Sequence, residues 1–396
     1  MLRKSPLLFI LIAIFVDMLG YGIVIPLLPF YVQRLGSGAA MAGTLGSLYA
    51  LTQLFSGPVL GALSDRYGRR PVLLICLFGT GLAYLTLGLA DSLALVFLAI
   101  GVDGVTGGNV STAYAYIADV TTPDIRARGM GLAGAAFGLG LMAGPALGGL
   151  LSVYGLGVPA FVACGIALSN VLFGLIVLPE SLPRDRRSPL ATWRALNWVT
   201  QLSQVLRLAP ARMLLLTIFM LNLAFAGLQT NFPLYSQLRF GWTATYNGLF
   251  FAFVGVCAVV VQGVLFGWIQ PRLGERRLAV AGLALMASSL AGIASAGEGW
   301  MMYPLVALGA LGSGISIPSL TGLLSQRAPA DAQGQLMGGT QVVLNLAMIA
   351  GPTLAGVAFE QIAAAAPYWL GSGFALCASL LAWVALYRPA MPLAVG

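Results

Sequence analysis

Histidine is absent from this sequence, and charged residues are scarce. Asp, Glu, Lys and Arg together make up only 8% of the 396 residues. The lack of histidine removes imidazole acid–base chemistry and histidine-bound metal sites. A soluble protein carries charge on about a quarter of its residues, so this composition excludes a water-soluble enzyme.

Cysteine is also rare. The four cysteines, Cys76, Cys164, Cys257 and Cys377, lie singly within apolar runs, a pattern that offers neither a disulfide framework nor a zinc site. The sequence has no glycine loop of the GxxxxGK type and therefore no recognisable ATP-binding loop. We expect no cofactor and no metal.

Apolar residues are abundant and lie in long runs. They make up 59% of the chain, and the mean hydropathy is +0.92. A helix of about 20 apolar residues crosses the roughly 30 Å of hydrocarbon in a bilayer. The pattern predicts an all-α membrane protein with twelve transmembrane helices. The runs cover residues 7–32, 39–62, 71–90, 93–118, 129–153, 157–178, 213–236, 244–270, 278–297, 300–325, 335–361 and 366–387.

Basic residues predict the orientation in the membrane. With the N-terminus inside, every Lys and Arg except Arg34 and Arg239 lies on the inner side. Basic residues in short loops stay in the cytoplasm, so we expect both termini to be cytoplasmic. The first run follows Arg3 and Lys4, but it is too long for a signal peptide and lacks a small-residue cleavage site; we expect a retained span. The net charge of +8 is spread over short loops and does not indicate nucleic-acid binding.

The longest polar segment divides the runs into six and six. It covers residues 179–212 and separates a half at 1–178 from a half at 213–396. Apolar residues at helical spacing from 193 to 208 favour a helix at the membrane surface. A plain linker is the alternative interpretation.

The two halves repeat each other. The segment AGPALGG at 143–149 recurs as AGPTLAG at 350–356, an offset of 207 residues, and GALSDRYGRR at 61–70 has a weaker echo at 267–276. Six spans are an even number, so the two copies have the same orientation and form two parallel-repeat six-helix halves. Transporters built this way bind substrate near the membrane midplane, between the halves.

Four segments carry a family resemblance. GALSDRYGRRP (61–71) and GAAFGLGLMAGPALGG (134–149) resemble signature motifs of the drug/proton antiporters of the major facilitator superfamily. DMLGYGIVIPLLP (17–29) and RFGW (239–242) are similar to the tetracycline/proton antiporters of bacteria. The resemblance implies an exporter in the inner or plasma membrane of the cell that works by alternating access.

The first motif concentrates charge in a short loop. Glycine permits the tight backbone that this loop needs, and Arg69 can reach Asp119 if the ends of spans two and four are neighbours. The resemblance implies a conformational latch. A positive-inside anchor is the alternative, and it accounts for the arginines but not for Asp65. The predicted latch comprises Gly61, Asp65, Arg66, Gly68, Arg69, Arg70 and Asp119.

The second motif predicts close helix packing in span five. Small residues let a neighbouring helix approach, and proline removes a backbone hydrogen bond and bends the span. The resemblance implies that this face meets the first helices of the other half and seals the outer end of the cavity. The residues are Gly134, Gly138, Gly144, Pro145, Gly148 and Gly149.

Two carboxyls lie well inside the spans, Asp17 in span one and Asp103 in span four. A charge at a helix centre costs on the order of 2.5–3.5 kcal/mol, so both are candidates for proton coupling. A structural carboxyl, held by hydrogen bonds and never titrating, is the alternative for each. The resembled family commonly has an arginine where this chain has Ile100, so altered coupling and facilitated diffusion are alternatives to proton antiport.

Other polar residues within the spans are candidates to line a substrate cavity, because polar groups at this depth face protein or water. Nearby Phe225, Phe250, Phe251 and Phe253 suit a lipophilic or amphipathic compound. The candidates are Tyr21, Asn109, Tyr114, Asn222, Gln229, Asn231, Gln262, Gln341 and Asn345.

Together these features predict a secondary active transporter that exports lipophilic or amphipathic compounds, coupled to protons and working as a monomer in the bilayer. Three alternatives stay open. They are a lipid or glycolipid flippase on the same fold, an uncoupled facilitator, and a membrane-embedded enzyme.

Overall fold

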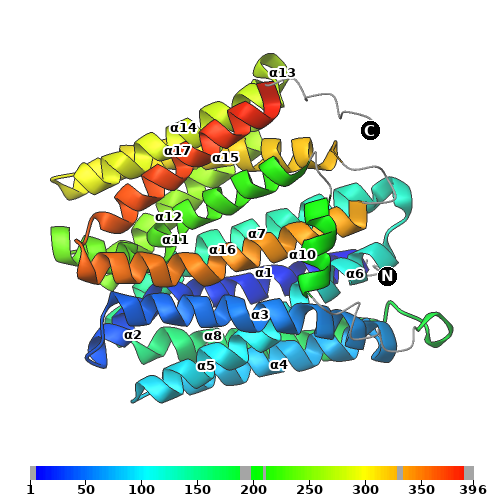
Figure 1. Cartoon of the computed structure of the whole chain (residues 1–396). Helices are drawn as coiled ribbons and strands as arrows, with labels where there is room; N and C mark the ends of the chain where they lie inside the picture. Colours follow the sequence, from blue (N-terminus) through cyan, green and yellow to red (C-terminus); the bar gives the residue numbers. More distant parts are fainter. Residues whose placement is uncertain (1–5, 188–197, 208–210, 328–332, 388–396) are drawn as a thin grey trace.

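The computed structural model describes residues 6–187, 198–207, 211–327 and 333–387, and its regular elements over these residues are all helices. The long helices run side by side in one bundle (Figure 1). In hydrocarbon the backbone polar groups of a spanning segment must be satisfied within the protein, and a helix achieves this with its own hydrogen bonds. The prediction of an all-α membrane protein is confirmed.

Six spans come from the first part of the chain, which we call the N-terminal half (residues 6–178). Two spans are interrupted, the first by a short helix that contains Pro26 and the fourth by one that contains Gly107 and Gly108. The helices are α1 (Pro6–Val24), η1 (Ile25–Leu27), α2 (Leu28–Arg34), α3 (Ala39–Tyr67), α4 (Arg69–Gly88), α5 (Leu93–Thr106), η2 (Gly107–Asn109), α6 (Val110–Val120), α7 (Pro123–Leu151), η3 (Ser152–Tyr154) and α8 (Gly157–Val177), followed by η4 (Arg184–Arg186).

The other six spans form the C-terminal half (residues 211–387). One of them contains a π-helical turn, η6 (Val261–Leu265). The remaining helices are α11 (Arg212–Phe240), α12 (Ala244–Val260), α13 (Phe266–Leu273), α14 (Glu275–Ser295), η7 (Gly299–Met301), α15 (Met302–Ser325), α16 (Gln333–Gln361) and α17 (Ala366–Tyr387). The predicted spans match these helices to within about six residues at each end.

Eleven segments of the described chain are long and apolar enough to cross a membrane, and α3 is the long helix missing from that set. Its sequence is rich in Ser, Thr and Gln, and several of these side chains face protein. The Ser47 hydroxyl donates to the carbonyl of Ile349 at 2.5 Å, and the Gln53 amide donates to the carbonyl of Gly107 at 3.1 Å. With α3 included, the bundle has the twelve spans predicted from the sequence.

The halves meet along two pairs of helices. α3 packs along α16, and α7 packs along α12. Within the halves, α1 packs on α7 and α11 packs on α16. The repeat offset of 207 residues relates α1 to α11, α3 to α12 and α7 to α16, so each pairing has a counterpart. We call the two contacts between halves the α3/α16 seam and the α7/α12 seam.

A helix of the linker crosses one end of the bundle. α10 (Trp198–Arg207) runs across the direction of the spans (Figure 1). Its Val205 is fully buried against Gly339 of α16, and the ring of Trp198 lies 6.5 Å from that of Phe55 on α3. This agrees with a helix in the linker; residues 193–197 and 208 of the predicted segment lie outside the described residues. We call this end, where α1 also begins, the linker side, and the opposite end the far side.

Candidate functional site

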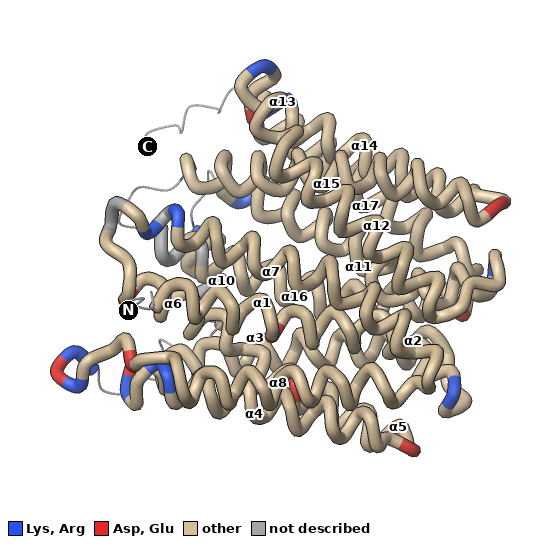
Figure 2. The backbone as a smooth tube through the Cα atoms, turned by 180° about the vertical axis from the view of Figure 1, so that it is seen from behind, with Lys and Arg blue, Asp and Glu red and all other residues tan. Residues whose placement is uncertain are grey.

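The two carboxyls within the spans lie in the interior of the N-terminal half. The Asn109 side chain lies beside Asp17 on α1, and the Thr80 side chain on α4 lies beside Asp103 on α5. Asp103 is 3% exposed, and its buried Oδ2 has no hydrogen-bond partner among the described residues. Figure 2 shows charged residues gathered at the two ends of the bundle, with isolated acidic positions in its interior.

Polar groups from four spans surround these carboxyls. The ring of Tyr21 on α1 lies 5.3 Å from that of Tyr49 on α3. The hydroxyls of Thr80 on α4 and Thr106 on α5 lie 3.0 Å apart. The two carboxyls therefore lie among polar side chains of the protein and not against lipid.

No basic side chain on α1 or α5 neutralises this core, because neither helix contains Lys, Arg or His. Ile100, at the position where the resembled family carries an arginine, is 1% exposed and packs among apolar residues. A buried charge without a partner costs several kcal/mol. The arrangement can therefore bind a proton or another cation at the carboxyls.

A second cluster of charges lies at the linker side. Gly68 ends α3 with a φ of +111°, a backbone conformation that favours glycine. The chain then turns directly into α4, where Arg69 bonds two carboxylates. Its Nη1 lies 2.5 Å from Asp65 Oδ1, and its Nε lies 3.1 Å from Asp119 Oδ2 at the end of α6. The structure thus brings together three of the predicted latch residues.

Sequence reasoning missed two members of this cluster, Glu180 and Ser181, which follow α8. Oε1 of Glu180 accepts a hydrogen bond from the backbone N–H of Arg69 at 2.9 Å, and the Ser181 hydroxyl donates to Asp119 Oδ2 at 3.0 Å. A carboxylate is favourable at a helix N-terminus, here that of α4. The sequence feature that could have indicated them is this pair of polar residues directly after the last apolar residue of span six.

The remaining latch candidates make other contacts. The guanidinium of Arg66 stacks over the ring of Tyr67 at 5.4 Å, and Arg70 Nη2 donates to the carbonyl of Leu175 at 2.5 Å. Gly61 faces Ser111 on α6, whose hydroxyl oxygen would lie 3.8 Å from a Cβ at that position. The charged contacts of Asp65, Arg69, Asp119 and Glu180 all lie within the N-terminal half and the segment after it.

The α7 glycines form two faces. A Cβ on Gly144 would lie 2.6 Å from the backbone of Gly22 on α1, and one on Gly148 would lie 2.5 Å from the carbonyl oxygen of Ile23. These contacts are within one half, contrary to the expectation that this face meets the other half. Gly149 does cross the α7/α12 seam, where a Cβ would lie 2.7 Å from Gly248.

The α7/α12 seam is closed on the far side and open toward the linker side. At Gly149, Pro145 and Met142, one face of α7 meets the other half. Toward the linker side, helical spacing continues this face with Gly138, Ala135 and Gly131. A Cβ at Gly131, Gly134 or Gly138 would meet no heavy atom within 4 Å, and the same holds for Gly263 in η6. Close packing at Gly134 and Gly138, predicted from the sequence, is absent in this conformation.

The two ends of the α3/α16 seam differ in the same way. On the far side, the Ser47 and Thr353 hydroxyls lie 2.7 Å apart, and Oε1 of Glu360 accepts a hydrogen bond from the backbone N–H of Ala40 at 3.0 Å. Toward the linker side, the α3 stripe continues with Leu51 and Phe55, which are 41% and 54% exposed.

On α16, Asn345 and Gln341 continue the stripe that bonds Ser47, and the two amides bond each other at 3.2 Å. Toward the linker side, the α7 glycines have open space beside them and the α3 side chains keep exposed surface, while α10 contacts Phe55 and Gly339 there.

The residues predicted to line a substrate cavity differ in their exposure to solvent. Gln229, Gln262, Gln341 and Tyr114 are exposed, Tyr21 and Asn222 are partly buried, and Asn109 and Asn345 are buried. Asn231 has no exposed surface, and neither polar atom of its side chain has a hydrogen-bond partner among the described residues. It does not line an accessible space in this structure, contrary to the sequence-based expectation.

The four phenylalanines expected near the cavity also differ in exposure. Phe250 is fully buried and stacks on Phe232 with ring centroids 4.7 Å apart. It belongs to the aromatic core of the C-terminal half, next to Trp242, and its predicted place in a substrate cavity is wrong for this conformation. Phe225, Phe251 and Phe253 are partly buried, so they retain accessible surface.

Comparison with known proteins agrees with this architecture. The family model described as Major Facilitator Superfamily matches residues 10–345 and 263–394. The chain is 35% identical to the class C tetracycline resistance protein of Escherichia coli, over 99% of this chain and 97% of that protein. It is 29% identical to multidrug resistance protein 2 of Bacillus subtilis, over 90% of each.

A solved structure is similar over nearly the whole chain. The human organic anion transporter MFSD10 (TETRAN) superposes with a TM-score of 0.74 at 25% identity, covering 96% of this chain and 100% of that one. The family model matches more than half of the chain, and a relative more than 30% identical covers nearly all of it. The chain belongs to the Major Facilitator Superfamily.

Proposed function

We propose that this protein is a secondary active transporter that exports a lipophilic or amphipathic compound by alternating access. The observation that carries the proposal is the shape of the two seams. Both are packed on the far side through contacts such as Ser47 with Thr353 and Gly149 with Gly248. On the linker side, Gly131, Gly134 and Gly138 have open space beside them, and Leu51 and Phe55 keep exposed surface. From this difference we infer an opening through which a compound enters between the halves from one side only.

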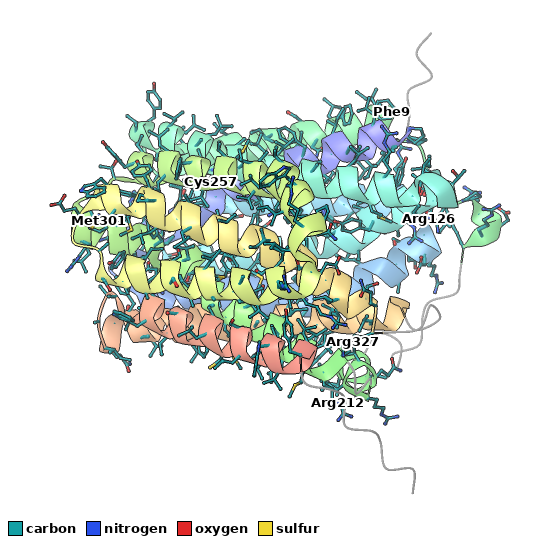
Figure 3. The ribbon with its side chains drawn as sticks, turned by 90° about the horizontal axis from the view of Figure 1, so that it is seen from above. Phe9, Arg126, Arg212, Cys257, Met301 and Arg327 are labelled. Carbon is teal, nitrogen blue, oxygen red and sulfur yellow. The ribbon has the colours of Figure 1, made fainter. Side chains whose placement is uncertain are left out.

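The distribution of arginine supports an orientation. Arg126, Arg212 and Arg327 lie at one end of the bundle, and Met301 lies at the other (Figure 3). Basic residues in short loops are retained in the cytoplasm. The linker side is therefore the cytoplasmic side, both termini are cytoplasmic, and the opening faces the cytoplasm, where an exporter must take up its cargo.

The lining of the opening supports a lipophilic or amphipathic cargo. Leu51 and Phe55 present apolar surface, while Gln262 and Gln341 supply amides. Such a mixture of apolar walls and a few polar groups is typical of small-molecule sites. The named relatives confer tetracycline or multidrug resistance, so tetracycline is the first compound to test.

Asp17 and Asp103 are the groups that we assign to proton coupling. Both lie in the interior of the half that lines the opening, and α1 and α5 hold no basic residue that would fix them as ion pairs. A carboxyl that takes up a proton in one conformation and releases it in the other couples the two movements.

Transport in reconstituted vesicles tests this proposal. The purified protein is placed in liposomes with tetracycline on one side, with and without an imposed pH gradient. We expect accumulation that depends on the gradient and collapses when a protonophore is added. Equal rates with and without the gradient would contradict proton coupling, and no movement of tetracycline or of other amphipathic drugs would contradict drug export.

An uncoupled facilitator is the second candidate, and one observation favours it. Ile100 is buried among apolar residues, so the carboxyls lack the cation that the resembled family places there. A facilitator would equilibrate tetracycline across the vesicle membrane without accumulating it. The same assay therefore separates the two candidates.

A further inference from the structure

Asn170 on α8 is a buried polar residue that the transport proposal does not use. It is 3% exposed, and its Nδ2 donates a hydrogen bond to the carbonyl of Ala13 on α1 at 2.9 Å. Ala13 lies one helical turn before Asp17. The other polar atom, Oδ1 of Asn170, is buried without a hydrogen-bond partner among the described residues. A buried carbonyl oxygen of this kind requires an explanation.

A small cavity lies beside this amide. About 40 Å³ of it is open to water, and its wall is mostly apolar, with Asp17, Asn109, Tyr114 and Asn170 as polar members. One water needs roughly 10–15 Å³ and two to four polar partners, so the cavity has room and partners for a few waters. Every lining residue belongs to the N-terminal half, so no residue of the C-terminal half forms the wall of this cavity.

A second pocket lies next to this cavity on the linker side. Leu178, just after α8, lines both this cavity and a wider pocket formed with Phe9, Arg70 and Pro179. Phe9 lies at the same end of the bundle as Arg126 (Figure 3). The buried Leu178 side chain therefore stands between the cavity beside Asp17 and the linker-side pocket.

We propose that Asp17 exchanges protons with the cytoplasm through this water-filled cavity inside the N-terminal half, with Asn170 as the positioning residue that orders the water. The inference rests on the proposed proton coupling and names its route. Oδ1 of Asn170 accepts a hydrogen bond from a water, and the Asp17 carboxyl passes its proton to that water and on past Leu178.

The route has a mechanistic consequence. The cargo enters through the opening between the halves, whereas the proton leaves through the interior of one half. Proton release from Asp17 therefore does not require the cargo to move aside. Asn170 also fixes α1 one turn from Asp17 through the Ala13 carbonyl, which holds the carboxyl beside the water.

Two substitutions test the route. Asn170→Leu keeps the approximate size of the side chain and removes both polar atoms, and Leu178→Trp places a larger side chain between the cavity and the linker-side pocket. Each variant is reconstituted and assayed for pH-driven tetracycline accumulation and for counterflow exchange, which moves no net protons. We expect both variants to lose at least ten-fold in pH-driven rate and to keep counterflow within about two-fold of wild type.

Matched controls lie on the outer face of the same helix. Ser169 and Leu172 are exposed and line neither pocket, so Ser169→Leu and Leu172→Trp are expected to leave both rates unchanged. Asn170→Ser leaves room and a hydroxyl for water, and we expect it to recover most of the pH-driven rate. This rescue separates the ordering of water from a structural role.

The outcomes are distinct. If wild type shows no pH-driven accumulation, the proposed coupling fails, and the route fails with it. If wild type is pH-driven but either Asn170→Leu or Leu178→Trp keeps the full pH-driven rate, the coupling stands and the route is overturned. Equal loss of counterflow and pH-driven transport in Asn170→Leu, without rescue in Asn170→Ser, also overturns it, because the residue is then only structural.

Discussion

The hydroxyls of Ser47 on α3 and Thr353 on α16 lie 2.7 Å apart, although 306 residues separate them in the chain. The Ser47 hydroxyl also donates to the carbonyl of Ile349. These contacts join the two halves on the far side of the bundle, where the seam must part if the transporter is to open outward. Ser47 and Thr353 therefore report directly on the conformational cycle.

A reversible crosslink at this contact should arrest transport. In the double variant Ser47→Cys/Thr353→Cys, the sulfur atoms are close enough for a disulfide in the conformation described here. We expect oxidation to block tetracycline transport almost completely and reduction to restore it, as measured in vesicles before and after each treatment. The single Cys variants are the controls. Full transport by the oxidised, crosslinked protein would show that this seam does not open during the cycle.

The latch should control switching rather than binding. Asp65 bonds Arg69, which also bonds Asp119, so Asp65→Asn removes one ion pair from the network. We expect about ten-fold slower transport, equivalent to about 1.4 kcal/mol in the barrier, with tetracycline affinity largely intact. Asp91→Asn, in an exposed turn on the far side, is the control. An equal loss of affinity and rate would contradict the latch role.

Glu180 should stabilise the start of α4. Its carboxylate accepts hydrogen bonds from the backbone N–H groups of Arg69 and Leu182. Hydrogen bonds to charged groups contribute about 1.5–3 kcal/mol, so Glu180→Ala should lower the thermal unfolding temperature of the purified protein measurably. Asp185→Ala, in the exposed η4 turn, should have little effect. Equal unfolding temperatures for the two variants would show that Glu180 is not a structural cap.

Close packing in α7 gives a further prediction. A side chain on Gly144 would collide with the backbone of Gly22 on α1, and overpacking costs about 1–3 kcal/mol or more. We expect Gly144→Leu to reduce the yield of folded protein and its unfolding temperature. Gly165→Leu, at an exposed position on α8 with nothing within 4 Å, is the matched control. A Gly144→Leu protein as stable as this control would contradict the close approach.

The twelve spans could be predicted because each is a long apolar run, and lipid permits few other structures for such a run. α3 shows why the prediction does not depend on hydropathy alone. Its Ser47 and Gln53 bond protein rather than lipid, yet the helix keeps the necessary length between glycine-containing turns.

Contacts between distant segments were harder to predict. The proximity of Arg69 to Asp119 was expected only on the condition that the ends of two spans are neighbours. The contact of Glu180 with the start of α4, and of Asn170 with Ala13, depends on how α8 packs, which local sequence does not specify. Asn231 shows the opposite error, because a polar residue within a span was assigned to a cavity although its face of α11 is buried.

The central claim is that Asp17 carries the proton that drives export. The most direct measurement compares pH-driven tetracycline accumulation with counterflow exchange for wild type and Asp17→Asn in the same vesicle preparation. We predict that Asp17→Asn loses pH-driven accumulation and keeps counterflow, because exchange moves no net protons. Full pH-driven accumulation by Asp17→Asn would contradict the claim and make this carboxyl a structural one.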